Sequence, residues 1–275
     1  MPRASANGME LEYDIFGAAG AAPLLLINGL GAQMIGWDDD FCRLLADRGF
    51  RVIRFDNRDV GLSTRAEEPY TLDDMADDAA GLLGVLGIRA ANVVGASMGG
   101  FIAQLVALNH PDRVLSLTSI MSGPSGEDQV QPTDEARALL FAPAPETREG
   151  RIELGVYAKQ KLLGPADPFD EPMERARIAA AIDRAYNPAG FIRPLQAIAA
   201  AIGRLERLRS LRVPTLVIHG DADNLVSVAN GHSVAAAIPG ARLVEIEGMG
   251  HDVPRRVWRQ VADEITALAR QAAAC

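Results

Sequence analysis

The 275-residue sequence has little cysteine, and its two cysteines offer no disulfide framework. Cys42 falls in an expected helix and Cys275 ends the chain, so we expect no structural disulfide. We interpret Cys42 as a small buried apolar residue, because a buried thiol without an activating neighbour reacts poorly. Cysteine and histidine spacings typical of metal sites are absent, as are the phosphate-binding pattern GxxxxGKS/T and the dinucleotide pattern GxGxxG. We therefore expect no metal and no cofactor.

Basic side chains are scarce relative to acidic ones. Lysine and arginine together number 27 against 36 aspartates and glutamates, which gives a formal net charge of -9. Nucleic acids and anionic membranes both require a basic face, so we expect neither as a partner. No apolar run is long enough to cross a bilayer, and residues 1–8 lack the apolar centre of a secretory signal. These absences predict a cytoplasmic protein.

What the sequence does contain is a regular alternation of strand-like and helix-like segments. Asn7 and Gly8 are typical of a two-residue hairpin turn, and Thr71 with Asp74 resembles a helix capping box. The alternation predicts a doubly wound, mostly parallel central sheet flanked by helices, with right-handed crossovers. Expected strands cover 9–15, 24–27, 51–55, 92–94, 113–121, 213–219 and 241–246, and expected helices cover 40–48, 72–86, 101–108, 227–238 and 257–273.

The alternation breaks between about residues 123 and 212, where proline, alanine and charged residues are frequent and no strand pattern is evident. Helical patterns cover 178–186 and 195–208, and a structureless loop of this length would be unusual. The chain length fits one α/β domain with an insertion better than two unrelated domains. We predict a core formed by residues 1–123 and 213–275, and a helical cap formed by residues 124–212.

The segment Gly95-Ala96-Ser97-Met98-Gly99 joins an expected strand to an expected helix. A serine on such a sharp turn has a strained backbone and an outward-pointing hydroxyl, as nucleophilic serines do. Glycines are expected at its two ends because strand and helix pass too closely there for a Cβ atom. The five-residue pattern alone is weak, since its residues are common. With the flanking strand and helix, Ser97 becomes a candidate nucleophile and the Met98 N–H a candidate oxyanion donor.

A serine hydroxyl needs a base, and the sequence contains four histidines. His251 lies in a glycine-rich loop directly after the last expected strand, the strand end at which open α/β sheets hold their active sites. His110 precedes a proline at a helix end, His219 closes a strand as a core residue would, and His232 lies early in a helix. His251 is therefore the candidate base.

The base needs a buried carboxylate to orient it, and the loop after the strand ending at His219 carries two, Asp221 and Asp223. The loop after the preceding expected strand, residues 121–123, contains no acid. Ser97, one of these aspartates and His251 then follow the chain order of one class of catalytic triad, each on its own strand-end loop.

Five segments together resemble the α/β-hydrolase family over nearly the whole chain: 28–33, 54–63, 95–99, 217–223 and 248–251. The group that they resemble most comprises carboxylesterases such as aclacinomycin methylesterase and the mycobacterial lipase-like esterases. The resemblance implies the α/β-hydrolase fold, with Ser97 as nucleophile, Asp223 as acid and His251 as base. Asp223 is implied over Asp221 because the family's acid usually lies three residues after the loop glycine, here Gly220.

The resemblance also implies a second oxyanion donor, the backbone N–H of Leu30, beside that of Met98. In relatives this loop usually begins His-Gly, whereas here Asn28 replaces the histidine. The backbone donor does not depend on that side chain, so we still expect it, whereas the resemblance predicts the orientation of the loop less well.

Several other residues have both a structural and a functional interpretation. Asp56, Arg58 and Asp59 form either an acid-base or anion site or an ion-pair and turn network that braces a strand end, and we favour the network. Trp37 either lines the substrate pocket near the oxyanion loop or belongs to the core. Apolar residues of the insertion form either an acyl-binding wall or the cap's own core, namely Leu139, Leu140, Phe141, Tyr157, Leu162, Leu163 and Phe169.

These residues predict a serine carboxylic-ester hydrolase that works through an acyl-enzyme, and the cap predicts a small to medium apolar ester as substrate. The expected partners are that ester and water, with a homodimer left open. The same triad serves thioesterases, lactonases, C–C hydrolases and cofactor-free perhydrolases, which remain alternatives. Haloalkane dehalogenases and epoxide hydrolases are disfavoured, because they use aspartate where this chain has Ser97. A non-catalytic ligand-binding protein on the same fold is the alternative from another class.

Overall fold

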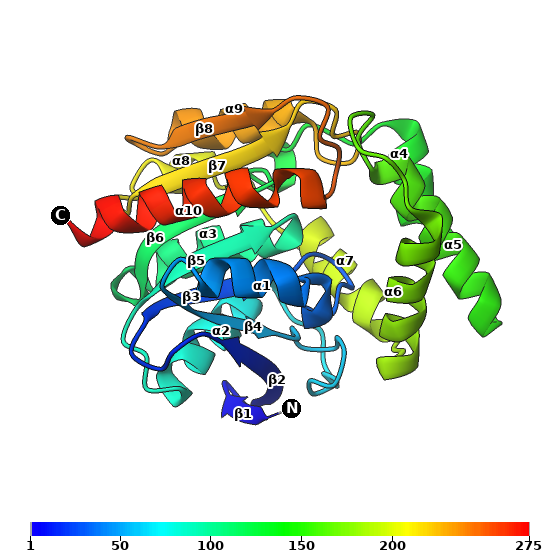
Figure 1. Cartoon of the computed structure of the whole chain (residues 1–275), viewed down its shortest axis with the longest axis horizontal. Coiled ribbons are helices and arrows are strands. Elements are labelled where there is room, and N and C mark those ends of the chain that lie inside the picture. The colour runs from blue at the N-terminus through cyan, green and yellow to red at the C-terminus, as the bar shows by residue number, and fades with distance from the viewer. Residues whose placement is uncertain (1, 275) are drawn as a thin grey trace.

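A computed structural model describes residues 2–274, which form one sheet of eight strands flanked by helices (Figure 1). The strands are β1 (Arg3–Ala6), β2 (Met9–Phe16), β3 (Ala22–Ile27), β4 (Phe50–Phe55), β5 (Ala91–Ala96), β6 (Val114–Ile120), β7 (Thr215–Gly220) and β8 (Arg242–Ile246). Their order in the sheet is β1-β2-β4-β3-β5-β6-β7-β8. β2 pairs antiparallel with β1 and β4, and all the other pairs are parallel. This confirms the predicted mostly parallel sheet.

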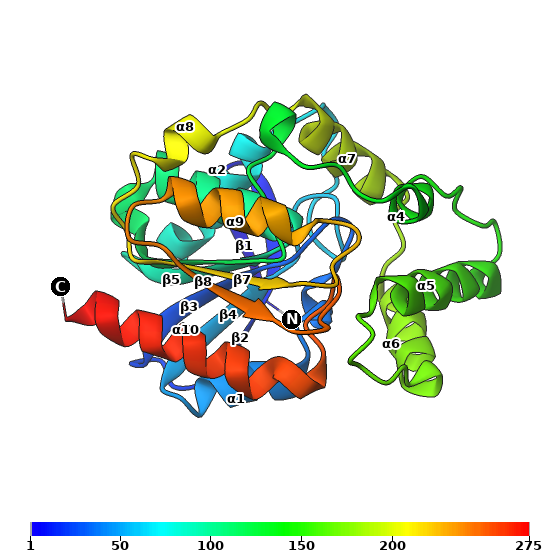
Figure 2. The ribbon, with the colours of Figure 1, turned by 90° about the horizontal axis from the view of Figure 1, so that it is seen from above.

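Helices cover both faces of the sheet (Figure 2). The described helices are α1 (Asp39–Ala46), α2 (Leu72–Val85), α3 (Met98–Asn109), α4 (Asp134–Leu140), α5 (Arg148–Leu162), α6 (Glu171–Arg184), α7 (Ala189–Ala200), α8 (Leu205–Leu208), α9 (Val228–Ala237) and α10 (Trp258–Ala273), with short 3₁₀ turns η1 (Met34–Gly36), η2 (Pro111–Arg113), η3 (Gly126–Asp128) and η4 (Arg255–Val257). α1 and α10 pack on one face, and α2, α3 and α9 pack on the other. Each face buries its own apolar cluster, so the sheet is enclosed between two helical layers.

Two local signals in the sequence form the structures that they predict. Asn7 and Gly8 make the turn between β1 and β2 with φ values of 50° and 76°, the positive range that tight hairpin turns require. Thr71 caps α2. Its hydroxyl accepts from the Asp74 N–H at 3.2 Å, and the Asp74 carboxylate accepts from the Thr71 N–H at 2.8 Å.

The insertion between β6 and β7 carries α4 to α8 in the described chain, and α4, α5 and α6 extend to one side of the sheet (Figures 1 and 2). α8 instead packs against α3 and α9. Leu208 is fully buried in the core cluster, and Arg204 donates to the Phe101 carbonyl at 3.3 Å. The division into a core of residues 1–123 and 213–275 and a cap of residues 124–212 stays a prediction.

The close approach of α3 to β3 makes Gly99 sensitive to substitution. A Cβ at position 99 would lie 2.1 Å from the Ile27 carbonyl oxygen, a backbone atom that cannot move freely. We expect Gly99→Ala to lower the free energy of unfolding by roughly 3 kcal/mol. Gly20→Ala is the control, because its new methyl group meets open space, and it should change stability by less than about 0.5 kcal/mol. Urea titration measures both, and equal stabilities would contradict the packing argument.

Candidate active site

Ser97 lies on the sharp turn between β5 and α3. Its backbone has φ of 55° and ψ of -123°, a conformation that residues other than glycine avoid. The Ser97 N–H donates to the Ile120 carbonyl at 2.9 Å, and the Ser97 carbonyl accepts from the Ser122 hydroxyl at 2.8 Å. A Cβ at Gly95 would lie 2.0 Å from the Gly99 carbonyl oxygen, which confirms the steric need for glycine. The turn thus holds a half-buried serine at the carboxyl edge of the sheet.

His251 reaches Ser97 from the loop after β8. Its Nε2 lies 2.9 Å from the Ser97 Oγ, which is hydrogen-bonding distance. Both the core and the insertion contribute hydrogen bonds to this loop. The Asp221 carboxylate accepts from the Gly248 N–H at 2.7 Å, and the Leu162 carbonyl at the end of α5 accepts from the His251 N–H at 2.8 Å. Asp221 therefore binds the backbone of the histidine loop, and the insertion binds the backbone of His251.

Asp223, in the loop after β7, completes a hydrogen-bonded chain. Its Oδ2 accepts from His251 Nδ1 at 2.8 Å. Its Oδ1 accepts from the N–H groups of Leu225 and Val226 at 2.9 and 2.8 Å. Because a carboxylate only accepts, Nδ1 of His251 carries the proton and Nε2 can accept from the Ser97 hydroxyl. The structure thus brings together the three residues that the sequence predicted as a triad.

The surroundings of Asp223 favour its ionised form. Burial alone would raise the pKa of Asp223, but the charges and hydrogen bonds of His251 and His219 together outweigh it and hold the pKa well below its usual range. His219 is fully buried, and its Nε2 donates to the Val226 carbonyl at 2.7 Å and lies 3.4 Å from Asp223 Oδ2. The interpretation of His219 as a buried core residue is confirmed, and the structure places it against the acid.

The loop after β3 lies directly against Ser97. A Cβ at Gly29 would lie 3.2 Å from the Ser97 Cβ and 3.6 Å from its Oγ. Asn28 braces this loop, since its Nδ2 donates to a carbonyl further along the loop at 2.7 Å and its Oδ1 accepts from the Gly29 N–H at 3.2 Å. Met98 is the first residue of α3, where a backbone N–H has no acceptor within the helix. The two expected oxyanion donors therefore lie in two segments next to Ser97. Leu30 belongs to the loop after β3, and Met98 is the first residue of α3.

Four of the candidates for lining a substrate pocket, Trp37, Leu139, Phe141 and Tyr157, lie in different environments. Trp37 is 4% exposed and stacks on Phe41 with ring centroids 5.8 Å apart, which favours its core alternative. Phe141 follows α4 and is 64% exposed, and Tyr157 on α5 is 48% exposed. Leu139 on α4 is half-buried. A lining role for these side chains stays a prediction.

Sequence reasoning missed the contacts that join the insertion to the oxyanion loop. The Phe191 ring on α7 lies over Gly31, where a Cβ would come within 3.0 Å of the ring. Gln33 and Arg184 connect the same loop to α6 through hydrogen bonds. No local pattern signals these contacts, because Gln33 and Arg184 are 151 residues apart in the sequence.

The charged residues after β4 form the predicted bracing network. Arg58 pairs with Asp78 at 2.6 Å, and Asp59 accepts from a backbone N–H later in the same loop at 2.9 Å. Asp56 accepts from the Leu62 N–H at 3.0 Å. The structural interpretation of these residues is confirmed.

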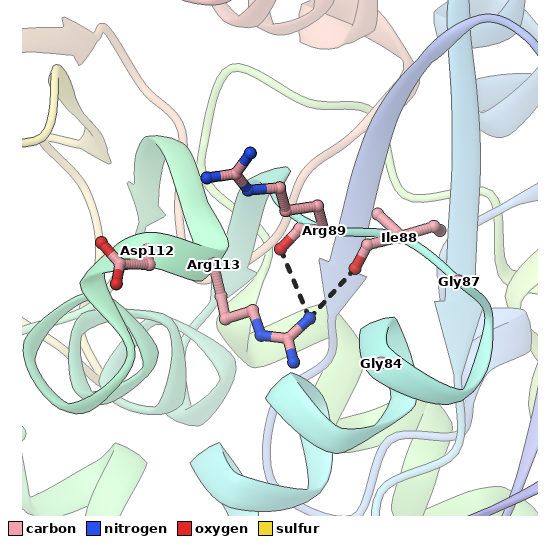
Figure 3. A pocket seen from close by; sticks show the side chains of 6 residues that line it. All are labelled: Gly84, Gly87, Ile88, Arg89, Asp112 and Arg113. Atoms are coloured by element: carbon pink, nitrogen blue, oxygen red, sulfur yellow. Dashed lines mark hydrogen bonds between the residues drawn. The ribbon is translucent and has the colours of Figure 1, made fainter.

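A hollow lies at the opposite edge of the sheet from Ser97 (Figure 3). It is formed at the amino ends of β5 and β6, where Arg113 donates to the carbonyls of Ile88 and Arg89 at 3.2 and 3.4 Å. Ser97 follows the carboxyl end of β5, so this hollow has no part in the candidate site. His110 and His232 are paired with surface carboxylates of their own at 2.6 and 3.1 Å.

Cys42 is buried beside Trp37, whose carbonyl lies 3.7 Å from its Sγ. Burial raises the pKa of the Cys42 thiol to about 12, so the reactive thiolate is scarce at neutral pH. We expect a Cys275→Ser variant, in which Cys42 is the sole cysteine, to react with iodoacetamide at about pH 8 only after unfolding. Mass spectrometry measures the alkylation, and rapid modification of the native protein would contradict the buried interpretation.

Within residues 2–274, no group of three or more histidine, cysteine or carboxylate side chains is arranged to hold a metal ion. Over the same residues, no helix combines the length and the apolarity that crossing a bilayer requires. The expected absence of a disulfide involves Cys275, which lies outside the described residues.

Known proteins resemble this chain over almost its whole length. Residues 22–254 match the alpha/beta hydrolase fold family. Rhodomycin D methylesterase DauP of Streptomyces sp. (strain C5) is 36% identical over 277 residues, covering 91% of this chain and 92% of that protein. The enol-lactonase from Burkholderia xenovorans LB400 has a TM-score of 0.78 at 28% identity, covering 100% of both chains. The meta-cleavage product hydrolase from Pseudomonas fluorescens IP01 shares the fold, with a TM-score of 0.82 at 22% identity over 99% of this chain and 98% of that chain.

The family match covers well over half of the chain, and the similarity to DauP extends over nearly the whole of both proteins. The mostly parallel sheet with helices on both faces agrees with the fold that the resemblance implied. The chain therefore belongs to the α/β-hydrolase family.

Proposed function

We propose that this protein is a serine hydrolase that cleaves carboxylic esters. The observation that carries the proposal is the hydrogen-bonded chain from Ser97 Oγ through His251 to Asp223, with steps of 2.9 and 2.8 Å. A hydroxyl, an imidazole and a buried carboxylate in this order make an activated nucleophile. The similarity to DauP, a protein named as a methylesterase, supports an ester as the bond that is cleaved.

In the first half-reaction, Ser97 Oγ attacks the ester carbonyl carbon while its proton passes to His251 Nε2. The carbonyl electron pair moves onto oxygen, where the N–H groups of Leu30 and Met98 stabilise the negative charge. Such a donor contributes roughly 3–4 kcal/mol in comparable enzymes. The C–O bond to the leaving group then breaks, and the leaving oxygen takes the proton from His251. Asp223, which is ionised, stabilises the imidazolium between these two transfers.

Water completes the reaction on the acyl-enzyme. His251 takes a proton from the water molecule as its oxygen adds to the acyl carbon. Collapse of this second tetrahedral intermediate expels Ser97 Oγ, which recovers its proton from the imidazolium. One ester and one water thus give one acid and one alcohol, with the enzyme unchanged.

We further propose a small to medium apolar ester as the substrate, with residues 124–212 as the cap over it. Phe191 supports this, because its ring lies over Gly31 beside the expected oxyanion donor. A series of p-nitrophenyl esters of increasing acyl length tests it. We expect kcat/KM to be largest for a short or medium acyl chain, and values that rise steadily toward long lipid-like chains would contradict the proposal.

A fluorophosphonate probe tests the nucleophile, because it modifies serines that are activated in a folded site. We expect one adduct per wild-type chain, on the peptide that contains Ser97, and none on the Ser97→Ala variant. A folded wild-type protein that stays unlabelled would contradict the hydrolase proposal and favour a non-catalytic ligand-binding protein.

A lactonase is a second candidate, favoured by the similarity to the enol-lactonase. A lactone is a cyclic ester, so the same residues would carry the same steps, and the leaving oxygen would stay attached to the acyl group. Comparing kcat/KM for a γ-lactone and for the open-chain ester of the same acid separates the two. A larger value for the lactone would favour the lactonase. Thioesters, C–C substrates and peracid formation can be assayed with the same enzyme preparation.

A further inference from the structure

The last turn of α6 is fastened to the loop that carries Leu30. Gln33, at the far end of that loop, donates from Nε2 to the carbonyls of Ala181 and Ala185 at 2.6 and 2.8 Å. Arg184, the last residue of α6, donates from Nη1 to the Gln33 Oε1 at 2.7 Å. Both ends of the Gln33 amide are therefore used to bind α6.

Arg184 also reaches a buried carboxylate of the core. Its Nη2 lies 2.8 Å from Oδ2 of Asp56, whose side chain is fully buried. The other oxygen of Asp56 accepts from the Met34 N–H at 2.7 Å. A buried carboxylate is costly without a cation or several donors, and α6 supplies the cation. Arg184 thus bridges Gln33 and Asp56, the two side chains that fix neighbouring residues of the loop.

The backbone on either side of Leu30 has little stiffness of its own. Leu30 lies between Gly29 and Gly31, and Gly31 has a φ of 67°, in the region that glycine enters freely. The loop therefore depends on contacts from outside it. The Phe191 ring lies over Gly31, and the bonds of Gln33 hold the end of the loop to α6.

The placement of Leu30 matters because an oxyanion donor works only within a narrow range of distance and angle. Misplacing a reacting group by about 1 Å can cost two orders of magnitude in rate. Gln33 is 9% exposed and the Arg184 side chain is 14% exposed, so water competes little for their hydrogen bonds. The contacts can therefore transmit the position of α6 to the loop.

We propose that α6 positions the oxyanion loop through Gln33 and Arg184, so that the cap helps to stabilise the oxyanion as well as enclosing the substrate. The inference rests on the ester-hydrolase function proposed above. Gln33 and Arg184 are positioning residues, because they act through Leu30. Disturbing them weakens interactions with the oxyanion and leaves ground-state binding and the pairing of His251 with Asp223 in place.

Two substitutions and a matched control test this. Gln33→Met removes the amide at nearly constant size, and Arg184→Lys keeps a cation beside Asp56 but loses the planar fork that also reaches Gln33. Arg148→Met is the control. Arg148 on α5 pairs at 2.6 Å with Asp183, which precedes Arg184 on α6, and both side chains of this pair are exposed. Each variant is assayed with p-nitrophenyl butyrate for kcat, KM and pH dependence. An alkyl trifluoromethyl ketone, which adds to serine and places an oxyanion in the donor site, supplies Ki.

We expect both test variants to lower kcat roughly tenfold or more and to raise Ki by a similar factor, with KM within about twofold and the acid limb of the pH profile unshifted. Arg148→Met should match the wild type within about twofold. If Gln33→Met fails to fold, the Ki of the ketone for Arg184→Lys alone tests the inference.

An unchanged Ki in the folded variants would overturn the inference. An equal rise in Ki for Arg148→Met would also overturn it, because that result indicates general loosening of α6. A wild type that neither hydrolyses the ester nor binds the ketone would overturn the proposed function and this inference together. If the wild type hydrolyses the ester and binds the ketone, the proposed function stands. The Ki values of the variants relative to the wild type then test the inference alone.

Discussion

Replacing Ser97 by alanine is expected to lower kcat for p-nitrophenyl ester hydrolysis by about 10⁴-fold or more, with little change in KM. Without Oγ no acyl-enzyme can form, and only attack by water, assisted by the oxyanion donors, remains. The fold should survive, because alanine keeps the Cβ and tolerates a φ of 55° about as well as serine does. Initial rates give kcat and KM, and circular dichroism verifies the fold.

Ser116→Ala is the matched control for that variant. Ser116 is a buried serine on the neighbouring strand β6, and its hydroxyl donates to Asn92 Oδ1 at 2.7 Å near the opposite end of the sheet. Its loss should reduce stability by about 1 kcal/mol and leave kcat within about threefold of the wild type. A Ser97→Ala variant that keeps more than about a tenth of the wild-type kcat would contradict the nucleophile assignment.

Asp223→Asn is expected to lower kcat by about 10³- to 10⁴-fold. Asparagine has nearly the same shape, but its NH₂ group facing His251 would favour the tautomer with the proton on Nε2. That nitrogen could then no longer accept from the Ser97 hydroxyl. The charge that stabilises the imidazolium would be lost as well. Measurement of kcat across pH, with the fold verified separately, tests the expectation.

Asp221→Asn is the control for Asp223→Asn, because Asp221 lies in the same loop and only two residues away. Asp221 accepts from the Gly248 N–H at 2.7 Å, and an asparagine oxygen can accept the same bond. We therefore expect kcat within about fivefold of the wild type. A loss of activity confined to Asp221→Asn would reverse the assignment of the acid.

The parts of the site that are local in sequence could be predicted. The steric demand at Gly95 and Gly99 follows from five consecutive residues, and the structure has the predicted close contacts there. The catalytic acid was expected in the loop after a strand, and this limited the candidates to Asp221 and Asp223. Only the family resemblance favoured Asp223 over Asp221. In the structure, Asp223 contacts His251, and Asp221 contacts the loop backbone.

The insertion was beyond prediction in detail, because long-range contacts decide its structure. The helical pattern over 195–208 predicts one helix, whereas α7 ends at Ala200 and α8 begins at Leu205. The break contains Gly203, where a Cβ would come within 2.3 Å of the Asp128 carboxylate and whose N–H donates to Glu127, so contacts with η3, far away in the sequence, hold this segment. α5 carries only two buried residues, Ile152 and Val156, and so presents no clear apolar stripe.

The most direct test of the account is to capture the acyl group on Ser97. p-Nitrophenyl acetate has a good leaving group, so acylation should be faster than hydrolysis of the acetyl-enzyme, which should accumulate. The account predicts a burst of one p-nitrophenolate per chain and, after acid quenching, one acetyl group on the peptide that contains Ser97. Sustained ester hydrolysis with the acetyl group on another residue, or on none, would contradict it.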